Sequence, residues 1–123
     1  MTPKLFLRIA GVLLVVVGIL GLLGLFGRIS EAAFFHPPYW INWAHLVIGV
    51  VILSVSIWGN AKTQTIFTSI AMVFGLALGL MGLLLGRWAA QRFQLPELAD
   101  PSDHIAHFIV GLLALWGWRN RAK

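Results

Sequence analysis

Four segments of this chain are apolar over about the length that a helix needs to cross a lipid bilayer. They run from Leu5 to Phe26, Pro38 to Trp58, Ile66 to Gly86 and Pro101 to Trp118. A helix rises 1.5 Å per residue, so a hydrocarbon core about 30 Å thick takes about 20 residues. The first three segments meet this length. The fourth is marginal, because its uncharged run covers only His104 to Trp118.

The start of the fourth segment carries helix-initiation signals that extend it to spanning length. Pro101 suits the first helical position, Asp100 can cap the helix, and Asp103 lies near the positive end of the helix dipole. We therefore count the turn at residues 100–103 as an interfacial first turn. The sequence then predicts an all-α fold with four transmembrane helices.

The composition agrees with an integral membrane protein. Apolar residues make up 59% of the 123 residues, against nine Lys and Arg and four Asp and Glu. Mean hydropathy is +0.89. The longest stretch outside the apolar segments, about residues 87–100, is too short to build a core of its own. The chain has no cysteine, which excludes disulfides and thiolate metal ligands.

An eight-residue pattern occurs twice and indicates an internal repeat. Residues 42–49 read NWAHLVIG, and residues 104–111 read HIAHFIVG. The pattern predicts a duplicated two-helix hairpin, with halves at about residues 1–61 and 62–123. Each half holds two spans, so both halves have the same orientation, which is the parallel type of repeat. His45 and His107 are 62 residues apart and should lie at matching depth, about 10 Å below the outer end of each helix.

The basic residues are distributed unequally between the two predicted sides of the membrane. Six of them fall on the side of the chain ends, namely Lys4, Arg8, Lys62, Arg119, Arg121 and Lys123. Three of them and all four acids fall on the other side, namely Arg28, Arg87, Arg92, Glu31, Glu97, Asp100 and Asp103. By the positive-inside rule both termini are cytoplasmic and the protein lies in an inner membrane. The net charge of +5 then needs no nucleic acid to explain it.

Small residues recur at helical spacing in the first and third apolar segments. Ala71, Gly75 and Gly79 lie on one helical face. Such stripes allow close backbone approach between helices in lipid. The sequence predicts that they pack against another helix, and it leaves open whether that helix belongs to this chain or to a second copy or another membrane protein.

His45 and His107 are the best candidates for a functional site, because an ionisable side chain at membrane depth costs free energy unless it is satisfied. Asn42 precedes His45 by three residues, and Asp103 precedes His107 by four. At these spacings Asn42 and Asp103 lie on the same helical face as the histidine that follows, so each can orient its ring. Gly49 and Gly111, four residues deeper, leave room for a neighbouring helix or a flat ligand.

Three interpretations of these features are considered, and the sequence favours the first, which involves no cofactor. In the first, the histidines join helices by hydrogen bonds in a non-enzymatic structural or interaction component. In the second, they ligate haem b or another tetrapyrrole, or hold a metal ion together with Asp103 or His36. The third is a small transporter or channel subunit, although little polarity lies near the midplane. We find no nucleophile with a positioned base and predict no catalytic residue.

The weaker histidines, His36 and His104, are expected to be solvated or locally paired. A zinc site formed by them with Asp100 and Asp103 is conceivable, although its spacing matches no compact structural motif. We therefore predict no dedicated metal site.

The motifs Asn-x-x-His-x-x-x-Gly in the second segment and Asp-x-x-x-His-x-x-x-Gly in the fourth accompany the four-segment layout. In these features the chain resembles a bacterial family of small four-helix membrane proteins that carries only a domain-of-unknown-function label. The resemblance covers roughly Leu5 to Trp118. It implies fold and location, and it brings no activity, cofactor or catalytic residue.

Overall fold

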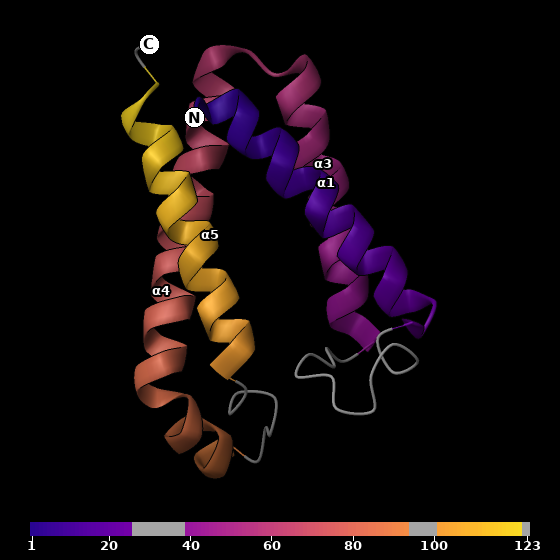
Figure 1. Cartoon of the computed structure of the whole chain (residues 1–123), viewed down its shortest axis with the longest axis vertical. Coiled ribbons are helices and arrows are strands. Elements are labelled where there is room, and N and C mark those ends of the chain that lie inside the picture. Colours follow the sequence, from indigo (N-terminus) through magenta and orange to yellow (C-terminus); the bar gives the residue numbers. More distant parts are fainter. Residues whose placement is uncertain (26–38, 94–100, 122–123) are drawn as a thin grey trace.

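All regular secondary structure in the described part of the chain is helical. The structure is a computed structural model, and it describes residues 1–25, 39–93 and 101–121. The helices are α1 (Pro3–Leu22), α3 (Tyr39–Trp58), α4 (Ala61–Phe93) and α5 (Pro101–Arg119) (Figure 1). The predicted all-α class is confirmed.

Local signals explain where α1 begins and ends. Pro3 lies at the first helical positions, and the Thr2 hydroxyl accepts a hydrogen bond from the Leu5 amide at 3.3 Å. The helix ends at Leu22, although the apolar segment continues to Phe26. Gly24 has a φ of +65°, a left-handed conformation that stops a helix and favours glycine.

Helix α4 is longer at both ends than the apolar segment from Ile66 to Gly86. Asn60 caps α4, because its side-chain oxygen accepts a hydrogen bond from the Thr63 amide at 2.9 Å. The helix then continues past Gly86 to Phe93, for 33 residues. At 1.5 Å per residue it is about 50 Å long, which exceeds the hydrocarbon thickness of a bilayer.

Among the described residues, three helices are long and apolar enough to cross a membrane: α1, α3 and α4. The fourth, α5, has a comparable length but begins with a polar turn that contains Asp103 and His104. The described ranges thus hold four helices, as predicted, and three of them are long and apolar enough to cross a membrane.

The helices form two antiparallel hairpins that meet at one end and diverge toward the other. α1 packs along α3, and α4 packs along α5. Between the hairpins, α1 contacts α4 and α5, and α3 contacts α4, whereas the α3 and α5 backbones do not approach each other. Both chain termini and the α3–α4 turn lie at the end where the hairpins meet (Figure 1). We call this the closed end and the opposite end the open end.

Glycines allow the two helices of each hairpin to approach closely. A Cβ added to Gly18 would lie 2.7 Å from the backbone nitrogen of Leu46, and one added to Gly75 would lie 2.8 Å from the Gly111 Cα. Gly79 packs on Phe108 in the same way. The small residues Gly75 and Gly79 therefore contact α5 of the same chain, which is one of the alternatives that the sequence left open.

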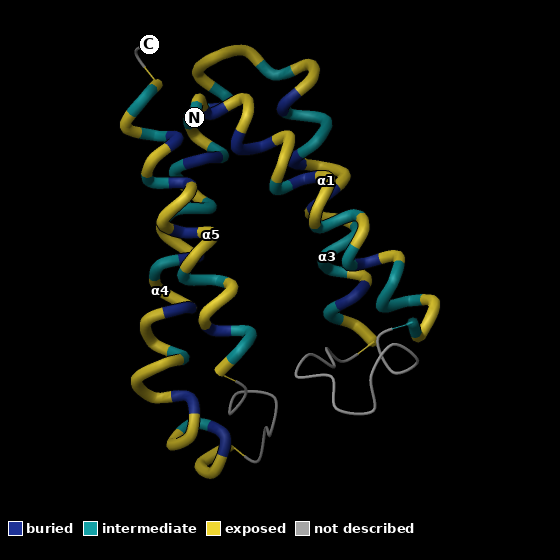
Figure 2. The backbone as a smooth tube through the Cα atoms, viewed as in Figure 1, coloured by how far each residue is buried: buried dark blue, intermediate teal, exposed yellow. Residues whose placement is uncertain are grey.

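The buried apolar core lies at the closed end. It consists of Phe6, Leu7, Ile52 and Ala114, contributed by α1, α3 and α5. Figure 2 shows further buried positions along each helix. The buried polar side chains next to it are satisfied locally. Gln64 donates to the carbonyl oxygens of Gly59 and Ser56, at 2.9 and 3.4 Å. These bonds fix the turn between α3 and α4 and thereby join the two hairpins.

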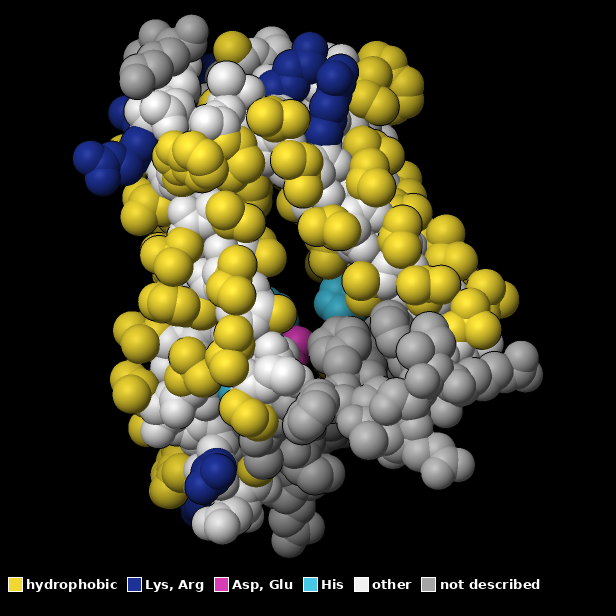
Figure 3. Space-filling view, in the orientation of Figure 1, with side chains coloured by type: hydrophobic (Ala, Val, Ile, Leu, Met, Phe, Trp, Pro, Cys, Tyr) yellow, Lys and Arg dark blue, Asp and Glu magenta, His cyan; other side chains and the backbone are white. Residues whose placement is uncertain are grey.

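The outward surfaces of the helices are mostly apolar. Large side chains on every described helix are exposed, among them Leu13, Trp58, Phe74 and Leu84 (Figure 3). An exposed apolar surface of this extent suits contact with lipid tails.

The glycine contacts yield a testable prediction. Gly18→Ala and Gly75→Ala place a methyl group against backbone that cannot rotate away, so each should destabilise the fold by about 1–3 kcal/mol. Thermal unfolding in detergent, followed by circular dichroism, measures the effect. Gly117→Ala is the control, because the added Cβ would have its nearest neighbour, the side-chain Cβ of Phe6, at 3.3 Å. Equal stability of all three variants would contradict close packing at Gly18 and Gly75.

Candidate functional site: a cleft between the hairpins

A hollow separates the two hairpins below the closed end. Figure 3 shows it between the two groups of helices, with histidine and acidic side chains on its walls. In the described ranges Asp103 is the only acidic residue, and the histidines are His45, His104 and His107. We call this hollow the inter-hairpin cleft.

The His107 ring is held in one orientation by its own helix. Its Nδ1 lies 2.8 Å from the backbone oxygen of Asp103 and 3.5 Å from the Asp103 carboxylate. A carbonyl oxygen only accepts, so Nδ1 carries the proton in this bond. In the neutral ring, Nε2 then holds a lone pair. A ligating histidine in a metalloprotein is usually oriented by such a bond from its other nitrogen.

His45 approaches the same region from the other hairpin. It is half-buried, and it lies near enough to Asp103 and His107 to interact with them electrostatically. Its Nδ1 is buried and has no hydrogen-bond partner within the described ranges. Each histidine is the seventh residue of its helix, about 9 Å from the helix start. The structure thus brings together the two residues that the repeat singled out.

Asn42 and His104 occupy corresponding places inside the hairpins. Asn42 is buried and packs on Gly21, where an added Cβ would overlap its side chain. His104 is 7% exposed and packs on Gly82 in the same manner. Asn42 is therefore used in contact with α1. His104 was expected to be solvated or locally paired, and its burial between α4 and α5 excludes the solvated alternative.

The two glycines below the histidines face neighbouring helices. A Cβ on Gly49 would lie 2.7 Å from the Val15 nitrogen, and one on Gly111 would lie 2.5 Å from the Leu76 nitrogen. Of the two uses that the sequence left open for this space, helix packing is the one observed. A ligand between the hairpins would be accommodated by the separation of α3 and α5.

Within the described ranges, no group of three or more His, Asp or Glu side chains is placed to hold a metal ion. His36 and Asp100, which the sequence analysis considered as zinc ligands, lie outside the described residues. The structure contributes two imidazoles and one carboxylate to the cleft.

No protein-family model, curated protein or solved structure matches this chain. The resemblance to a family of small four-helix membrane proteins stays a prediction.

The closeness of His45 and His107 can be tested by cross-linking, because the chain has no cysteine. We expect the double variant His45→Cys/His107→Cys to be bridged by a short bifunctional thiol reagent in membranes. In the control pair Val47→Cys/His107→Cys, the first side chain is turned by about 200° around α3 and should not be bridged. Mass spectrometry separates a bridged pair from two singly modified cysteines. Equal bridging in both pairs would contradict the facing arrangement.

Proposed function

We propose that this chain is a non-enzymatic, four-span protein of the bacterial inner membrane that binds haem b between its two hairpins. The observation that carries the binding proposal is the pair of imidazoles, His45 and His107, that approach one cleft from different hairpins.

The membrane topology is supported by the position of the chain ends. Both termini and the α3–α4 turn lie at the closed end, as an even number of crossings requires (Figure 1). The 19 residues of α5 make a helix about 28 Å long, which spans a bilayer when its polar first turn lies at the interface. The described basic residues of the closed end are Lys4, Arg8, Lys62, Arg119 and Arg121, which supports a cytoplasmic location for this end.

The duplication is supported by equivalent contacts in the two hairpins. Three residues of α1 in close glycine contacts with α3 have counterparts 61 residues later in α4. Their partner residues in α3 have counterparts 62 residues later in α5. The pairs are Gly18–Leu46 with Gly79–Phe108, Val15–Gly49 with Leu76–Gly111, and Gly21–Asn42 with Gly82–His104. Similar packing at a nearly constant offset is what a copied hairpin would retain.

This equivalence implies an approximate two-fold axis along the membrane normal. Such an axis exchanges α1 with α4 and α3 with α5. It agrees with the observed arrangement, in which α1 meets α4 while α3 and α5 lie apart across the cleft. His45 and His107 are then equivalent residues on opposite sides of the axis, which suits a ligand that accepts the same donor on both faces.

Haem iron is such a ligand. The porphyrin would bring four nitrogen ligands to its iron, so His45 and His107 would be the residues that hold it, and neutral histidine is a common haem ligand. The hydrogen bond from His107 Nδ1 to Asp103 leaves Nε2 as the donor atom. A bare metal ion would require more protein ligands than the two imidazoles. Because the chain has no cysteine, the haem would be held without covalent attachment.

A second candidate function is a structural or interaction component that binds no prosthetic group. It is favoured by Asn42 and His104, which show that polar residues of the repeated motif also serve helix packing. On this view His45 and His107 would face lipid or a partner helix.

The topology proposal predicts which cysteines an impermeant reagent reaches. Cysteines placed at Thr2 and Asn120 should both be protected in intact cells and labelled after permeabilisation. Arg92→Cys, near the other end of α4, should be labelled in intact cells. Labelling of the two chain ends from opposite sides would rule out four crossings.

The haem proposal predicts an absorption spectrum. Protein purified from haem-replete cells should show a Soret band and the sharp visible bands of a six-coordinate, low-spin haem. His45→Ala and His107→Ala should each convert the iron to five-coordination. Loss of an outer-shell partner costs about 10–100-fold in metal affinity, so loss of a ligand should weaken binding by at least about tenfold.

His104→Gln is the control for the haem experiment, because His104 lies inside a hairpin and not in the cleft. It should keep the spectrum of the unaltered protein. Folded protein that stays colourless and takes up no added haemin would overturn the proposal and leave the structural role. Metal found by elemental analysis without a Soret band would instead support a metal ion in the cleft.

A further inference from the structure

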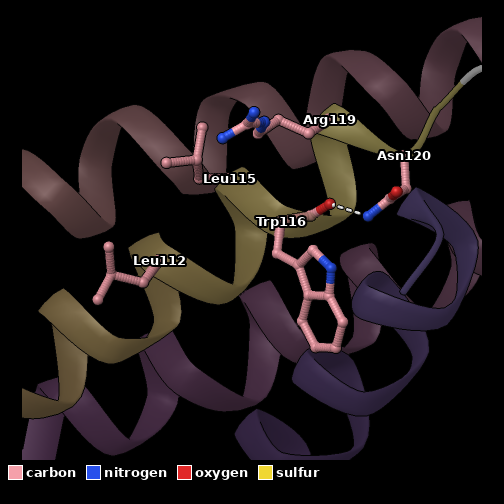
Figure 4. A pocket seen from close by; sticks show the side chains of 5 residues that line it. All are labelled: Leu112, Leu115, Trp116, Arg119 and Asn120. Carbon is pink, nitrogen blue, oxygen red and sulfur yellow. Dashed lines mark hydrogen bonds between the residues drawn. The ribbon is translucent and has the colours of Figure 1, made fainter.

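A small pocket lies beside α5 at the closed end, away from the inter-hairpin cleft. It has a volume of about 260 Å³ and is lined by Leu112, Leu115, Trp116, Arg119 and Asn120. Leu112, Leu115 and the Trp116 ring are its apolar part, and Arg119 and Asn120 stand at the end of the helix (Figure 4). The lining is thus apolar on the side of the membrane and cationic at the interface.

Arg119 differs from the nearby Arg121 in how its guanidinium is used. The Arg121 guanidinium lies 3.8 Å from the centre of the Trp118 ring and donates to the Trp118 carbonyl oxygen at 3.2 Å. Arg119 makes no ion pair within the described ranges. The acid described there, Asp103, lies 16 residues away on α5, or about 24 Å. The Arg119 guanidinium therefore retains donors for an anion.

The charge around the pocket has one sign. The described charged residues of the closed end are Lys4, Arg8, Lys62, Arg119 and Arg121, all of which are basic. A surface of this kind at the membrane interface attracts anionic headgroups, by about 1 kcal/mol for each basic residue near the surface. Guanidinium groups also match the geometry of phosphate oxygens.

The pocket is small for a complete ligand, since small-molecule sites usually have volumes of about 300–1,000 Å³. It suits part of a longer molecule that continues into the lipid. We propose that this pocket binds an anionic phospholipid, with the phosphate at Arg119 and the upper part of an acyl chain against Leu112, Leu115 and Trp116. Asn120 is less available, because its side-chain nitrogen donates to the Trp116 carbonyl oxygen at 2.8 Å.

A cation in the last turn of a helix also stabilises the helix through its dipole. Arg119 has this position in α5, so a loss of stability in an Arg119 variant would not by itself indicate a lipid site. The experiment must therefore measure contact between the lipid and the pocket, and not protein stability alone. Arg119→Lys keeps the charge at the helix end but loses the planar donor pair, and it separates the two roles.

The experiment uses Trp116 as the reporter. A variant with its five other tryptophans changed to phenylalanine is placed in vesicles of phosphatidylcholine with a minority of phosphatidylglycerol. In one set of vesicles the phosphatidylglycerol carries bromine atoms on its acyl chains, and in a second set the phosphatidylcholine carries them. We expect brominated phosphatidylglycerol to quench Trp116 about fivefold more than its bulk fraction predicts, the preference that corresponds to one basic residue at the surface.

The variants give the proposal its controls. Arg119→Gln should remove the preference and Arg119→Lys should reduce it, whereas Arg121→Gln should leave it intact. Excess inorganic phosphate should not displace the lipid, because the acyl chain contributes to binding. Displacement by inorganic phosphate would overturn the lipid assignment in favour of a free anion.

A second measurement does not depend on the tryptophan substitutions. Native mass spectrometry of the otherwise unaltered chain should retain phosphatidylglycerol in preference to phosphatidylcholine, and the preference should be lost in Arg119→Gln. Equal quenching by the two brominated lipids, or equal retention of both lipids in the unaltered chain, would overturn the proposal.

Discussion

Close backbone contact at glycine is the interaction on which the rest of this structure depends. Lipid tails are as apolar as leucine, so burial of apolar surface gives little drive for helices to associate in a membrane. Dispersion contacts between closely approaching backbones supply much of that drive instead. Gly18 and Gly49 provide the approach in one hairpin, and Gly75 and Gly111 provide it in the other. Each hairpin is thereby a tightly packed unit.

The contact between the hairpins is of a different kind and is confined to one end. There Phe6, Leu7, Ile52 and Ala114 form a buried cluster, and Gln64 joins the α3–α4 turn by hydrogen bonds to backbone oxygens. Beyond this cluster the hairpins diverge, and α3 and α5 face each other without backbone contact. Two rigid units joined at one end enclose a cleft, and the orientation of each helix within its hairpin decides which side chains line it.

The repeated motif divides its polar residues between packing and the cleft. Asn42 and His104 point at a glycine of the partner helix and are buried, whereas His45 and His107, three residues later, lie nearly a full turn further on. His45 and His107, the candidate site residues chosen from the sequence, come from different hairpins and lie near enough to interact electrostatically. Reasoning from the sequence predicts an orienting role for Asn42 and a solvated or locally paired His104. The signal that it missed is the glycine opposite each residue, Gly21 and Gly82, which lies on another helix.

The sequence by itself determined the helical class and the position of the apolar helices, because hydropathy and the length of a helix across lipid are local properties. It also singled out the two histidines, because each lies in a copy of the same eight-residue pattern. The helix bounds depend on more than hydropathy. α1 ends at Leu22, before the positive φ of Gly24 and within an apolar run, and α4 continues past Gly86 to Phe93 through a segment that contains Arg87 and Arg92. Only the tertiary structure decided that the glycine faces are used within the chain, that α3 and α5 stay apart, and that His45 and His107 face one cleft. These outcomes depend on the angle between helices, which arises from side chains far apart in the sequence and leaves no mark on any single segment.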